Sequence, residues 1–276
     1  MPEGDTILRT ARSLGRWLEA RVVTAASSQR AGVDAAKLVG QRVTAVEARA
    51  KHLLIRFSSG DVLHTHMRMT GSWHLYPAGQ RWRKPGWQAR VVLEAGDRVA
   101  VCFDAPVVEL LRAGDEDRHP SLARLGPDVL VHPLDLAEVR RRAALRPPEL
   151  SVGELLLDQQ VVSGIGNIYR SEALFVRRLN PWTPQQSIGD DGLDELVSTA
   201  SRLMGANLKP AQGFTRQFGP GAAGPRVYDR AGRPCRRCRA AIRTDLLGEQ
   251  ARRVWWCPGC QVTPMQQEGA GPAPPV

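Results

Sequence analysis

Residues 5–20 form the first segment with a regular hydrophobic pattern. Apolar side chains recur there at intervals of three and four residues, which places them on one face of an α-helix. These side chains belong to Ile7, Ala11, Leu14 and Leu18. The pattern predicts an amphipathic helix that packs against a core.

Short apolar runs replace the helical pattern over residues 52–111. The runs read HLLIRF, DVLHTHM, SWHLY, ARVVLE, RVAVCF and PVVELL. Turn sequences separate them, such as Ser-Gly-Asp at residues 59–61 and Ala-Gly-Asp at residues 95–97. Many short strands at this spacing are typical of an antiparallel sandwich or barrel. We expect such a domain over residues 1–125.

Helical patterns return after a hinge-like LGPD sequence at residues 125–128. One candidate helix covers residues 134–145 and ends before a Pro-Pro pair, which cannot continue a helix. Ser151 and Glu154 have the spacing of a capping box, which predicts the start of a second helix.

Two more helices are expected, one after Gly166 and one over about residues 190–206. Residues 210–225 are rich in Gly and Pro and predict a loop. The last fifteen residues, 262–276, are polar with Gly and Pro, and we expect them to be disordered.

The net charge indicates what kind of partner the protein binds. The chain has a formal charge of +10 and a pI near 10.1, with 34 Arg and four Lys. Residues 226–260 alone contain nine Arg against three acidic residues. A solvated basic surface is the simplest reading, and part of the Arg bias can reflect genomic base composition. The sign of the charge nevertheless favours a polyanionic partner, with phosphate the leading candidate.

No apolar run approaches the eighteen residues of a membrane span. The chain starts with an acidic, polar sequence rather than a signal peptide. We therefore expect no membrane association and a cytosolic or nucleoid location.

Four cysteines near the C-terminal end carry the strongest chemical signal. Two CxxC pairs, Cys235/Cys238 and Cys257/Cys260, are separated by eighteen residues. Two such pairs supply the four-sulfur cage that zinc prefers. Two disulfides or a redox CxxC are the alternatives, but a chain with no signal peptide and a lone fifth cysteine, Cys102, argues against disulfides. We predict one structural zinc ion, and we read Cys102 as a buried thiol.

The amino terminus offers a possible nucleophile. Removal of Met1 would expose Pro2 as a secondary amine, and α-amino groups titrate near pH 8, so a fraction is uncharged at neutral pH. Such an amine can attack an aldehyde-like sugar carbon to form an iminium ion. Glu3 beside it could transfer protons. Most residues at this position are ordinary chain termini.

Other residues have weaker signals. The glycines before Asn167 would let backbone N–H groups approach a phosphate at a helix start. Lys51 precedes a strand, and Arg252 could project from the tip of a hairpin. Both could equally be ordinary basic surface residues. We expect His64 and His66 to be structural, because no carboxylate or third histidine is placed to complete a metal site.

Taken together, these segments resemble the bacterial formamidopyrimidine-DNA glycosylase and endonuclease VIII family. The similarity extends over nearly the whole chain in the right order. The matching motifs are MPEGDT, AKHLLI, HMRMTGSW, LARLGPDVL, SGIGNIYRSEAL and RRVWWCPGCQ. The first and last of these are more similar to the endonuclease VIII branch.

The resemblance implies an α+β fold. A helix and antiparallel β-sandwich would form residues 1–125, and a hinge and linker helix residues 126–149. A helix-two-turn-helix domain would cover residues 150–225 and a zinc-finger hairpin residues 226–261. The protein is expected to be monomeric, to bind damaged double-stranded DNA and to use no small-molecule cofactor.

The resemblance also assigns roles to residues. Pro2 would be the Schiff-base nucleophile, Glu3 the proton donor for base release, and Lys51 an aid at the damaged sugar and in β-elimination. Arg252 would grip phosphate and assist δ-elimination. Further residues match DNA-contacting or site-neighbouring positions: Asn167, Arg124, Arg68, Met69 and Glu172.

Some residues depart from the family pattern. Thr6 stands where a second acidic residue is usual, which bears on proton handling. The Arg68-Met69-Thr70 sequence differs from a Gln-Leu-Tyr wedge. Residues 209–225 lack the aromatic Gly-rich motif of the formamidopyrimidine branch, which weakens an assignment to 8-oxoguanine.

The sequence therefore predicts a bifunctional DNA glycosylase and abasic-site lyase of base-excision repair. Oxidised pyrimidines are the expected substrates, and β,δ-elimination is the expected cleavage. A catalytically silent binder of damaged DNA with the same fold, or a glycosylase for oxidised purines, are the alternatives.

Overall fold

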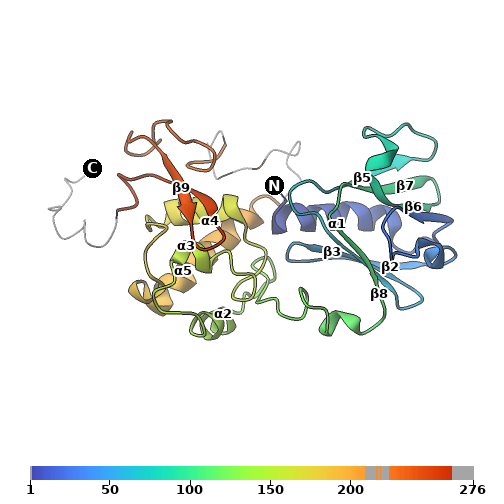
Figure 1. The fold of residues 1–276 in the computed structure, drawn as a ribbon, viewed down its shortest axis with the longest axis horizontal. Coiled ribbons are helices and arrows are strands. Elements are labelled where there is room, and N and C mark those ends of the chain that lie inside the picture. Colours follow the sequence, from blue (N-terminus) through green and yellow to red (C-terminus); the bar gives the residue numbers. More distant parts are fainter. Residues whose placement is uncertain (1, 209–215, 217, 219–223, 263–276) are drawn as a thin grey trace. The chain divides into compact units, whose positions relative to one another are not determined.

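The structure is a computed structural model that describes residues 2–208, 216, 218 and 224–262. The chain divides into two units, residues 1–124 and 125–276. Each unit has its own helices and strands (Figure 1). Each also has its own buried side chains.

The first unit begins with α1 (Gly4–Leu18), which confirms the predicted amphipathic helix. Its apolar face is fully buried and contacts β2 (Val43–Arg49) and β3 (His52–Phe57). The buried residues of this face include all four that define the sequence pattern: Ile7, Ala11, Leu14 and Leu18.

Two four-stranded antiparallel sheets make up the rest of this unit, as the sequence predicts. One has the order β1-β6-β7-β5, with strands Ala25–Ser28, Ala89–Ala95, Arg98–Phe103 and Ser72–Pro77. The other has the order β2-β3-β4-β8, where β4 is Val62–His66 and β8 is Val107–Leu111. Short 3-10 turns occur at Ala35–Leu38, Gly86–Gln88 and Asp115–Asp117.

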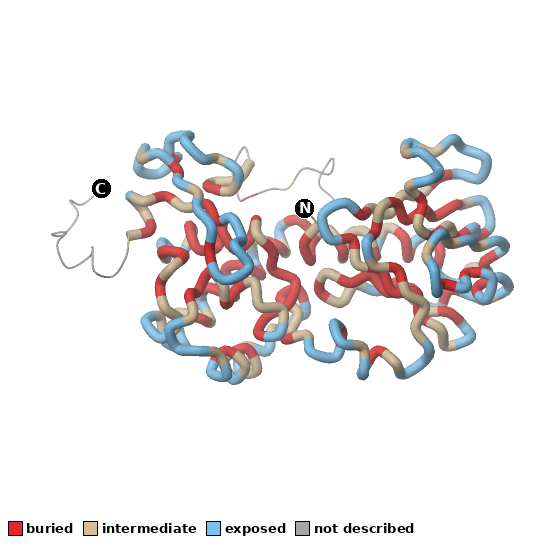
Figure 2. Tube along the Cα trace, viewed as in Figure 1, coloured by how far each residue is buried: buried red, intermediate tan, exposed pale blue. Residues whose placement is uncertain are grey.

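Alternation along β3 explains how the core forms. Leu53, Ile55 and Phe57 join α1 and the other sheet in one buried cluster. His52, Leu54 and Arg56 lie on the opposite face, because successive side chains of a strand point to opposite sides. Residues 112–124 contact that face, since the Glu116 carboxylate accepts two hydrogen bonds from the Arg56 guanidinium, at 2.6 and 3.0 Å. Figure 2 shows the resulting buried positions along this sheet.

The second unit contains α2 (Leu136–Ala143), α3 (Val152–Leu155), α4 (Asn167–Val176) and α5 (Gly189–Gly205), with a 3-10 turn at Gln185–Ser187. A hairpin of β9 (Arg243–Leu247) and β10 (Arg252–Trp256) follows. The overall class is α+β, as predicted.

The predicted helix start at Ser151 is confirmed, with Ser151 as the N-cap of α3 and Glu154 at the third helical position. Ser151 Oγ accepts from the Glu154 backbone N–H at 3.2 Å and donates to the Glu154 carboxylate at 2.7 Å. The helix itself has only four residues. The predicted loop at 210–225 and tail at 262–276 lie almost wholly outside the described residues.

Among the helices of the described residues, none is long and apolar enough to cross a membrane.

We predict that Gly126→Ala destabilises the second unit. A Cβ at this position would lie 2.4 Å from the Val161 carbonyl oxygen, a backbone atom that cannot move aside alone. Forcing an atom into such a site costs about 1–3 kcal/mol. Gly205→Ala is the matched control, because a Cβ there meets open space at a helix end. Denaturant unfolding that ranks the two variants equally stable would contradict this packing.

Candidate functional site

Pro2 and Glu3 lie at the start of α1. The Glu3 carbonyl accepts the first helical hydrogen bonds, from the N–H groups of Thr6 at 2.9 Å and Ile7 at 3.1 Å. Pro2 is partly exposed, whereas the whole Glu3 residue is 0% exposed. The helix therefore fixes the position of the chain start, with a carboxyl group buried next to it.

Lys51 lies in the two-residue turn that joins β2 to β3. The strands close on this turn through the pair Arg49 and His52. Ala50, the first turn residue, is buried and has a φ of 56°. Both turn types that suit a two-residue hairpin need a positive φ at this position, which normally favours glycine. Lys51 is therefore held on a strained and tightly packed turn.

A second tight turn presents Arg68 and Met69. Arg68 has a φ of 45°, and the Gly71 N–H donates to the Met67 carbonyl at 2.8 Å across the turn. Met69 is 65% exposed, as several other large apolar residues are, so its place at the tip of this turn distinguishes it rather than its exposure. This geometry suits a side chain that inserts into a partner.

The expectation that His64 and His66 have no neighbouring carboxylate or third histidine is wrong. Glu109 Oε2 lies 2.8 Å from His64 Nδ1 and 3.0 Å from His119 Nε2. The potential ligand atoms of these three residues all lie within 4.8 Å of one another. Pairing of β4 with β8 brings His64 opposite Glu109, and this pairing is not visible in the sequence.

In the second unit, the predicted phosphate loop precedes α4. Gly164 has a φ of 97°, and its N–H donates to Gln159 Oε1 at 3.0 Å. The Gln159 amide in turn donates to the carbonyl groups of Leu157 and Ile165, at 2.8 and 3.1 Å. Asn167 is the first residue of α4, where free N–H groups and the helix dipole favour an anion.

Arg170 joins this loop to the hairpin. Its guanidinium is fully buried, donates to Asn167 Oδ1, and donates to the Arg253 carbonyl at 2.7 Å. Arg252 is exposed and is the first residue of β10 after the hairpin turn, as predicted. One buried cation therefore contacts both Asn167 and the strand that carries Arg252. Sequence analysis missed Arg170, although it lies in the SGIGNIYRSEAL motif.

Glu172 is buried at 0% exposure rather than on the surface. Its carboxylate accepts hydrogen bonds from the backbone N–H groups of Arg226, Val227 and Tyr228, at 2.9–3.0 Å. It therefore anchors the segment that leads into the cysteine-rich region, a structural role that the sequence alone did not indicate.

The four cysteines predicted to bind a metal lie together. The Sγ atoms of Cys235 and Cys260 are 3.9 Å apart, and those of Cys238 and Cys257 are 3.3 Å apart. Tetrahedral zinc with sulfur ligands needs S–S separations of roughly 3.8 Å. All five cysteines of the chain are free, and the fifth, Cys102, is buried as expected. The four together could hold a metal ion.

Gln261 attaches this cluster to the helices. Its Oε1 accepts from the Cys257 N–H at 2.9 Å, and its Nε2 donates to the Leu179 carbonyl at 2.8 Å. Asn180 Nδ2 donates to the Gln261 carbonyl at 2.9 Å. Phe175, Trp255, Cys235 and Cys257 belong to a small apolar cluster, and Cys260 packs against it.

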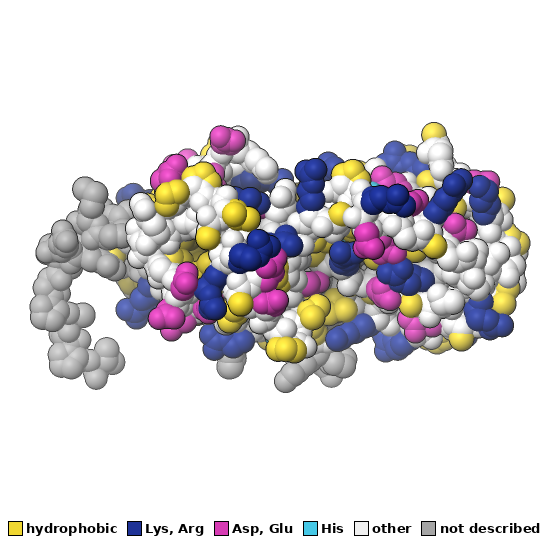
Figure 3. Space-filling view, turned by 90° about the horizontal axis from the view of Figure 1, so that it is seen from below, with side chains coloured by type: hydrophobic (Ala, Val, Ile, Leu, Met, Phe, Trp, Pro, Cys, Tyr) yellow, Lys and Arg dark blue, Asp and Glu magenta, His cyan; other side chains and the backbone are white. Residues whose placement is uncertain are grey.

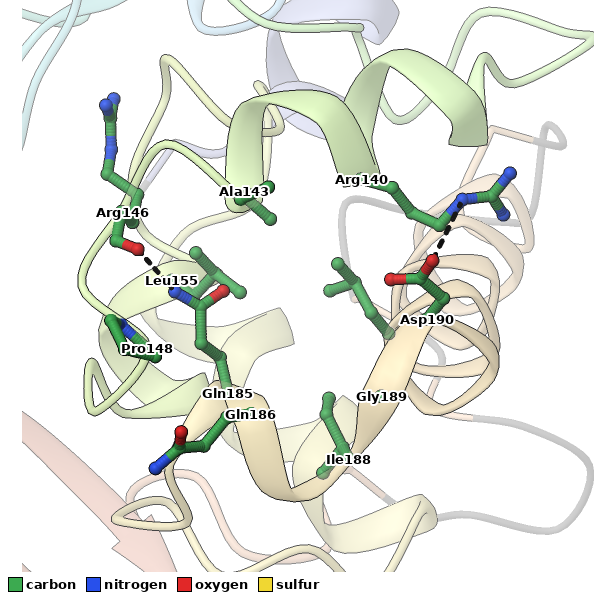
Figure 4. A pocket seen from close by; sticks show the side chains of 12 residues that line it. Arg140, Ala143, Arg146, Pro148, Leu155, Gln185, Gln186, Ile188, Gly189 and Asp190 are labelled. Atoms are coloured by element: carbon green, nitrogen blue, oxygen red, sulfur yellow. Dashed lines mark hydrogen bonds and ion pairs between the residues drawn. The ribbon is translucent and has the colours of Figure 1, made fainter.

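One pocket is a hollow of about 340 Å³ among α2, α3 and α5. Figure 4 shows the Arg140–Asp190 ion pair at its edge and the Gln185 amide that donates to the Arg146 carbonyl. None of the predicted site residues lines it, among those that the structure describes. Basic side chains on one face are interspersed with acidic ones (Figure 3). This hollow therefore does not coincide with the predicted site residues.

The site residues predicted from the sequence fall into two groups. The first unit carries Pro2, Glu3, Lys51, Arg68, Met69 and Arg124, which is exposed at its end. The second carries Asn167, Glu172, Arg252 and the four cysteines.

Comparison with known proteins gives matches over both units. Residues 1–106 match the formamidopyrimidine-DNA glycosylase N-terminal domain, and residues 125–218 match the formamidopyrimidine-DNA glycosylase H2TH domain.

Two relatives are similar over almost their whole lengths. A probable endonuclease 8 2 of Streptomyces coelicolor is 38% identical, with 98% of this chain and 97% of the relative covered. The DNA-(apurinic or apyrimidinic site) lyase Nei2 of Mycolicibacterium smegmatis is 34% identical, with 95% and 99% covered.

Among solved structures, the formamidopyrimidine-DNA glycosylase of Lactococcus lactis bound to abasic-site DNA has the same fold. The TM-score is 0.79 at 20% identity, with 95% of this chain and 100% of that chain covered.

We predict that Glu172→Gln weakens the attachment of the segment around residues 226–228. Hydrogen bonds to a charged acceptor are worth about 1.5–3 kcal/mol, and a neutral amide cannot replace all of them. Glu195→Gln is the matched control, because Glu195 makes only a surface ion pair with Arg177, worth about 0–1 kcal/mol. Limited proteolysis should cut the Glu172 variant faster near residue 226. Equal cleavage of the two variants would contradict the anchoring role.

Proposed function

Because this chain belongs to the formamidopyrimidine-DNA glycosylase and endonuclease VIII family, we propose that it is a bifunctional DNA glycosylase and abasic-site lyase. Two of its relatives are named as an endonuclease 8 and as an abasic-site lyase. These names support a role in base-excision repair on damaged double-stranded DNA. A DNA substrate places the enzyme in the bacterial cytoplasm. The observation that carries the residue assignments is the position of Pro2 at the start of α1, beside the buried Glu3.

The first step is attack by the Pro2 amine on C1′ of an extruded nucleotide. The amine must be uncharged, and the positive end of the α1 dipole favours that form. The C1′–N bond of the lesion breaks as the C1′–N bond to Pro2 forms, and Glu3 donates the proton that the departing base needs. Removal of Met1 is required, because only then does residue 2 carry a free secondary amine.

The Pro2 nitrogen then loses its proton, and its lone pair expels O4′, which is protonated as the C1′–O4′ bond breaks. Strand cleavage follows from the ring-opened iminium ion. The positive nitrogen acidifies the C2′–H bond, whose proton is removed while the C3′–O bond breaks in β-elimination. A second elimination breaks the C5′–O bond. Lys51 assists at the sugar, and Arg252 holds a phosphate at the leaving end. Asn167 and the N–H groups at the start of α4 hold the neighbouring phosphate without reading sequence.

Extrusion of the base needs a side chain in the gap that it leaves, because unstacking costs a few kcal/mol. The exposed Met69 suits the role of this wedge. Arg68 and Arg124 are proposed to contact the DNA beside it. Glu172 acts indirectly, by anchoring residues 226–228. Oxidised pyrimidines remain the proposed substrates.

The metal is proposed to be one structural zinc ion held by Cys235, Cys238, Cys257 and Cys260. Four thiolates form a closed set, which suits a structural rather than a catalytic ion. The ion would supply the folding energy that the hairpin lacks, since its apolar cluster is small. The chemistry above is carried by the side chains.

The covalent step can be tested with borohydride. Wild-type protein incubated with abasic-site duplex should give a reduced adduct that mass spectrometry maps to the N-terminal peptide, starting at residue 2. Pro2→Gly should sharply reduce its yield, because the secondary amine is lost. An adduct on a lysine, or none at all, would refute the mechanism.

Glu3→Gln is the matched variant for this test. It retains the amine, so trapping on ready-made abasic DNA should persist. Base release from thymine-glycol duplex should fall by about 10²–10⁴-fold, the usual contribution of a positioned acid. Running the wild-type protein on thymine-glycol and 8-oxoguanine duplexes decides between pyrimidine and purine substrates.

We predict that Cys257→Ser abolishes zinc binding and lowers DNA affinity, because the hairpin loses one of four ligands. Cys102→Ala is the control, since that thiol lies in the core of the other unit and should leave one zinc per chain. Elemental analysis and DNA titration give the two readouts. Unchanged DNA affinity in protein shown to be free of zinc would contradict the proposal.

A further inference from the structure

A chain of polar groups runs across the outer face of the β2-β3-β4-β8 sheet, on the side covered by residues 112–124. His52 Nδ1 lies 2.8 Å from His64 Nε2, and His64 Nδ1 lies 2.8 Å from Glu109 Oε2. Strand register produces this alignment, because His52 pairs with His66, and His64 pairs with Glu109. His52 is 7% exposed and His64 is 1% exposed.

The protons of this chain can be assigned from its far end. The backbone N–H groups of Ser121 and Leu122 donate to His119 Nδ1, at 3.2 and 3.3 Å. That nitrogen therefore carries no proton, and His119 Nε2–H donates to Glu109 at 3.0 Å. Glu109 therefore acts as a hydrogen-bond acceptor. This is the behaviour of an ionised carboxylate, which can only accept.

The protonation states of Glu109, His64 and His52 follow from this assignment. Burial raises the pKa of Glu109, but hydrogen bonds from His64 and His119 lower it further, so its pKa is below the ordinary value. Burial lowers the pKa of His64 despite the hydrogen bond to Glu109, so the ring is neutral. A neutral His64 that donates from Nδ1 must accept at Nε2, and His52 must therefore donate from Nδ1.

These assignments argue against a metal ion among His64, Glu109 and His119. A ligating imidazole nitrogen must present a lone pair, whereas both nitrogens that face Glu109 carry protons. His119 could free its Nε2 only by moving its proton to Nδ1, where two backbone N–H groups already donate. The geometry instead matches a carboxylate that orients two histidines in series.

The end of this series lies at the turn that carries Lys51. His52 is the first residue after Lys51, and its ring lies 4.6 Å from that of His66, edge to face. Burial, followed by the charge of Lys51, lowers the pKa of His66 to about 4. The Lys51 turn also contains Ala50 with its positive φ, a conformation that persists only where the surroundings hold it.

We propose that Glu109, acting through His64 and His52, is a positioning residue for Lys51. The hydrogen-bonded series fixes His52 in one orientation, and His52 and its pairing partner Arg49 fix the turn between them. This inference rests on the proposed function, since it gives the series a role in the step that Lys51 assists.

Other charged groups around the histidine series do not position Lys51 in this way. Arg49, Lys51 and Arg68 face the histidines as cations, and Glu116 faces them as an anion paired with Arg56. Burial, followed by the charge of His66, lowers the pKa of His52 to about 2, so the ring is uncharged near neutral pH. The series therefore acts by orientation and adds no positive charge beside Lys51.

Nitrogen NMR of the full-length zinc-loaded protein tests the proton assignments without any activity. With ¹⁵N-labelled histidine, His52 and His64 should be Nδ1–H tautomers and His119 an Nε2–H tautomer. Binding of a second zinc ion at these residues, or the opposite tautomer of His64, would overturn the series.

Single-turnover nicking of abasic duplex tests the positioning role. Glu109→Gln replaces one acceptor oxygen with an amide donor that opposes the N–H groups of His64 or His119. The rate at saturating enzyme should fall by about tenfold, a modest case of the loss that misplaced groups cause. DNA affinity should not change, because Glu109 is not among the residues proposed to contact DNA. Glu109→Asp, which retains the carboxylate, should restore part of the rate.

Two comparisons make this result specific. Glu116→Gln loosens the same covering segment through Arg56 but leaves the histidine series intact, so its rate should equal that of the wild type. In a Lys51→Ala background, Glu109→Gln should have no further effect, because coupled residues are not additive.

Additive losses, or an equal loss from Glu116→Gln, would overturn the positioning role. Wild-type protein that neither nicks nor forms a borohydride adduct would refute the proposed function instead, and the NMR tautomers would still decide the structure of the series.

Discussion

The packing of α1 against the sandwich is the constraint on which the proposed chemistry depends. Chain ends are usually poorly ordered, so a reactive amine at residue 2 needs a rigid support. Four apolar residues on one helix face provide it, because their burial fixes the helix and therefore the residues just before it. A loss of register in this helix would move Pro2 and Glu3 together.

In the second unit, buried polar and charged groups rather than a large apolar area fix the hairpin on the helices. Its hairpin has a small apolar cluster, so polar anchors attach it to the helices. Arg170 contacts Asn167 and the carbonyl of Arg253, Glu172 contacts three consecutive N–H groups, and Gln261 links Cys257 to Leu179. Breaking a buried hydrogen bond is costly, and more so when one partner is charged, which gives these contacts directional strength that a few apolar side chains could not supply.

Much of this arrangement is visible in the sequence, where the signal is local. The helical period of residues 5–20, the capping box at Ser151 and the spacing of the cysteines each depend on near neighbours, and the structure confirms all three. Strands β1 and β2 were missed, because AASS has no apolar alternation and residues 43–49 place charged and polar side chains among the apolar ones.

The non-local contacts could not be predicted. His64 meets Glu109 only because β4 pairs with β8, across forty-five residues of chain. Arg170 looks like one of many arginines, and its burial appears only when the hairpin docks on α4. Polar residues of this kind carry no periodic signal, since a single buried contact does not repeat along the chain.

Both units share one design principle. Apart from the buried Glu3, the residues proposed to contact DNA are exposed or partly exposed. Two of them, one in each unit, are supported by a buried polar group. Asn167 is backed by Arg170, and Lys51 by the series that ends at Glu109. An exposed Lys or Asn side chain has many rotamers, and ordering it on binding costs free energy. A buried hydrogen-bonded partner reduces that cost before DNA arrives, because the backbone that carries the DNA-contacting residue is already fixed. Phosphate contacts supply little sequence information, so their value to an enzyme that recognises damage lies in the precision with which they hold the strand.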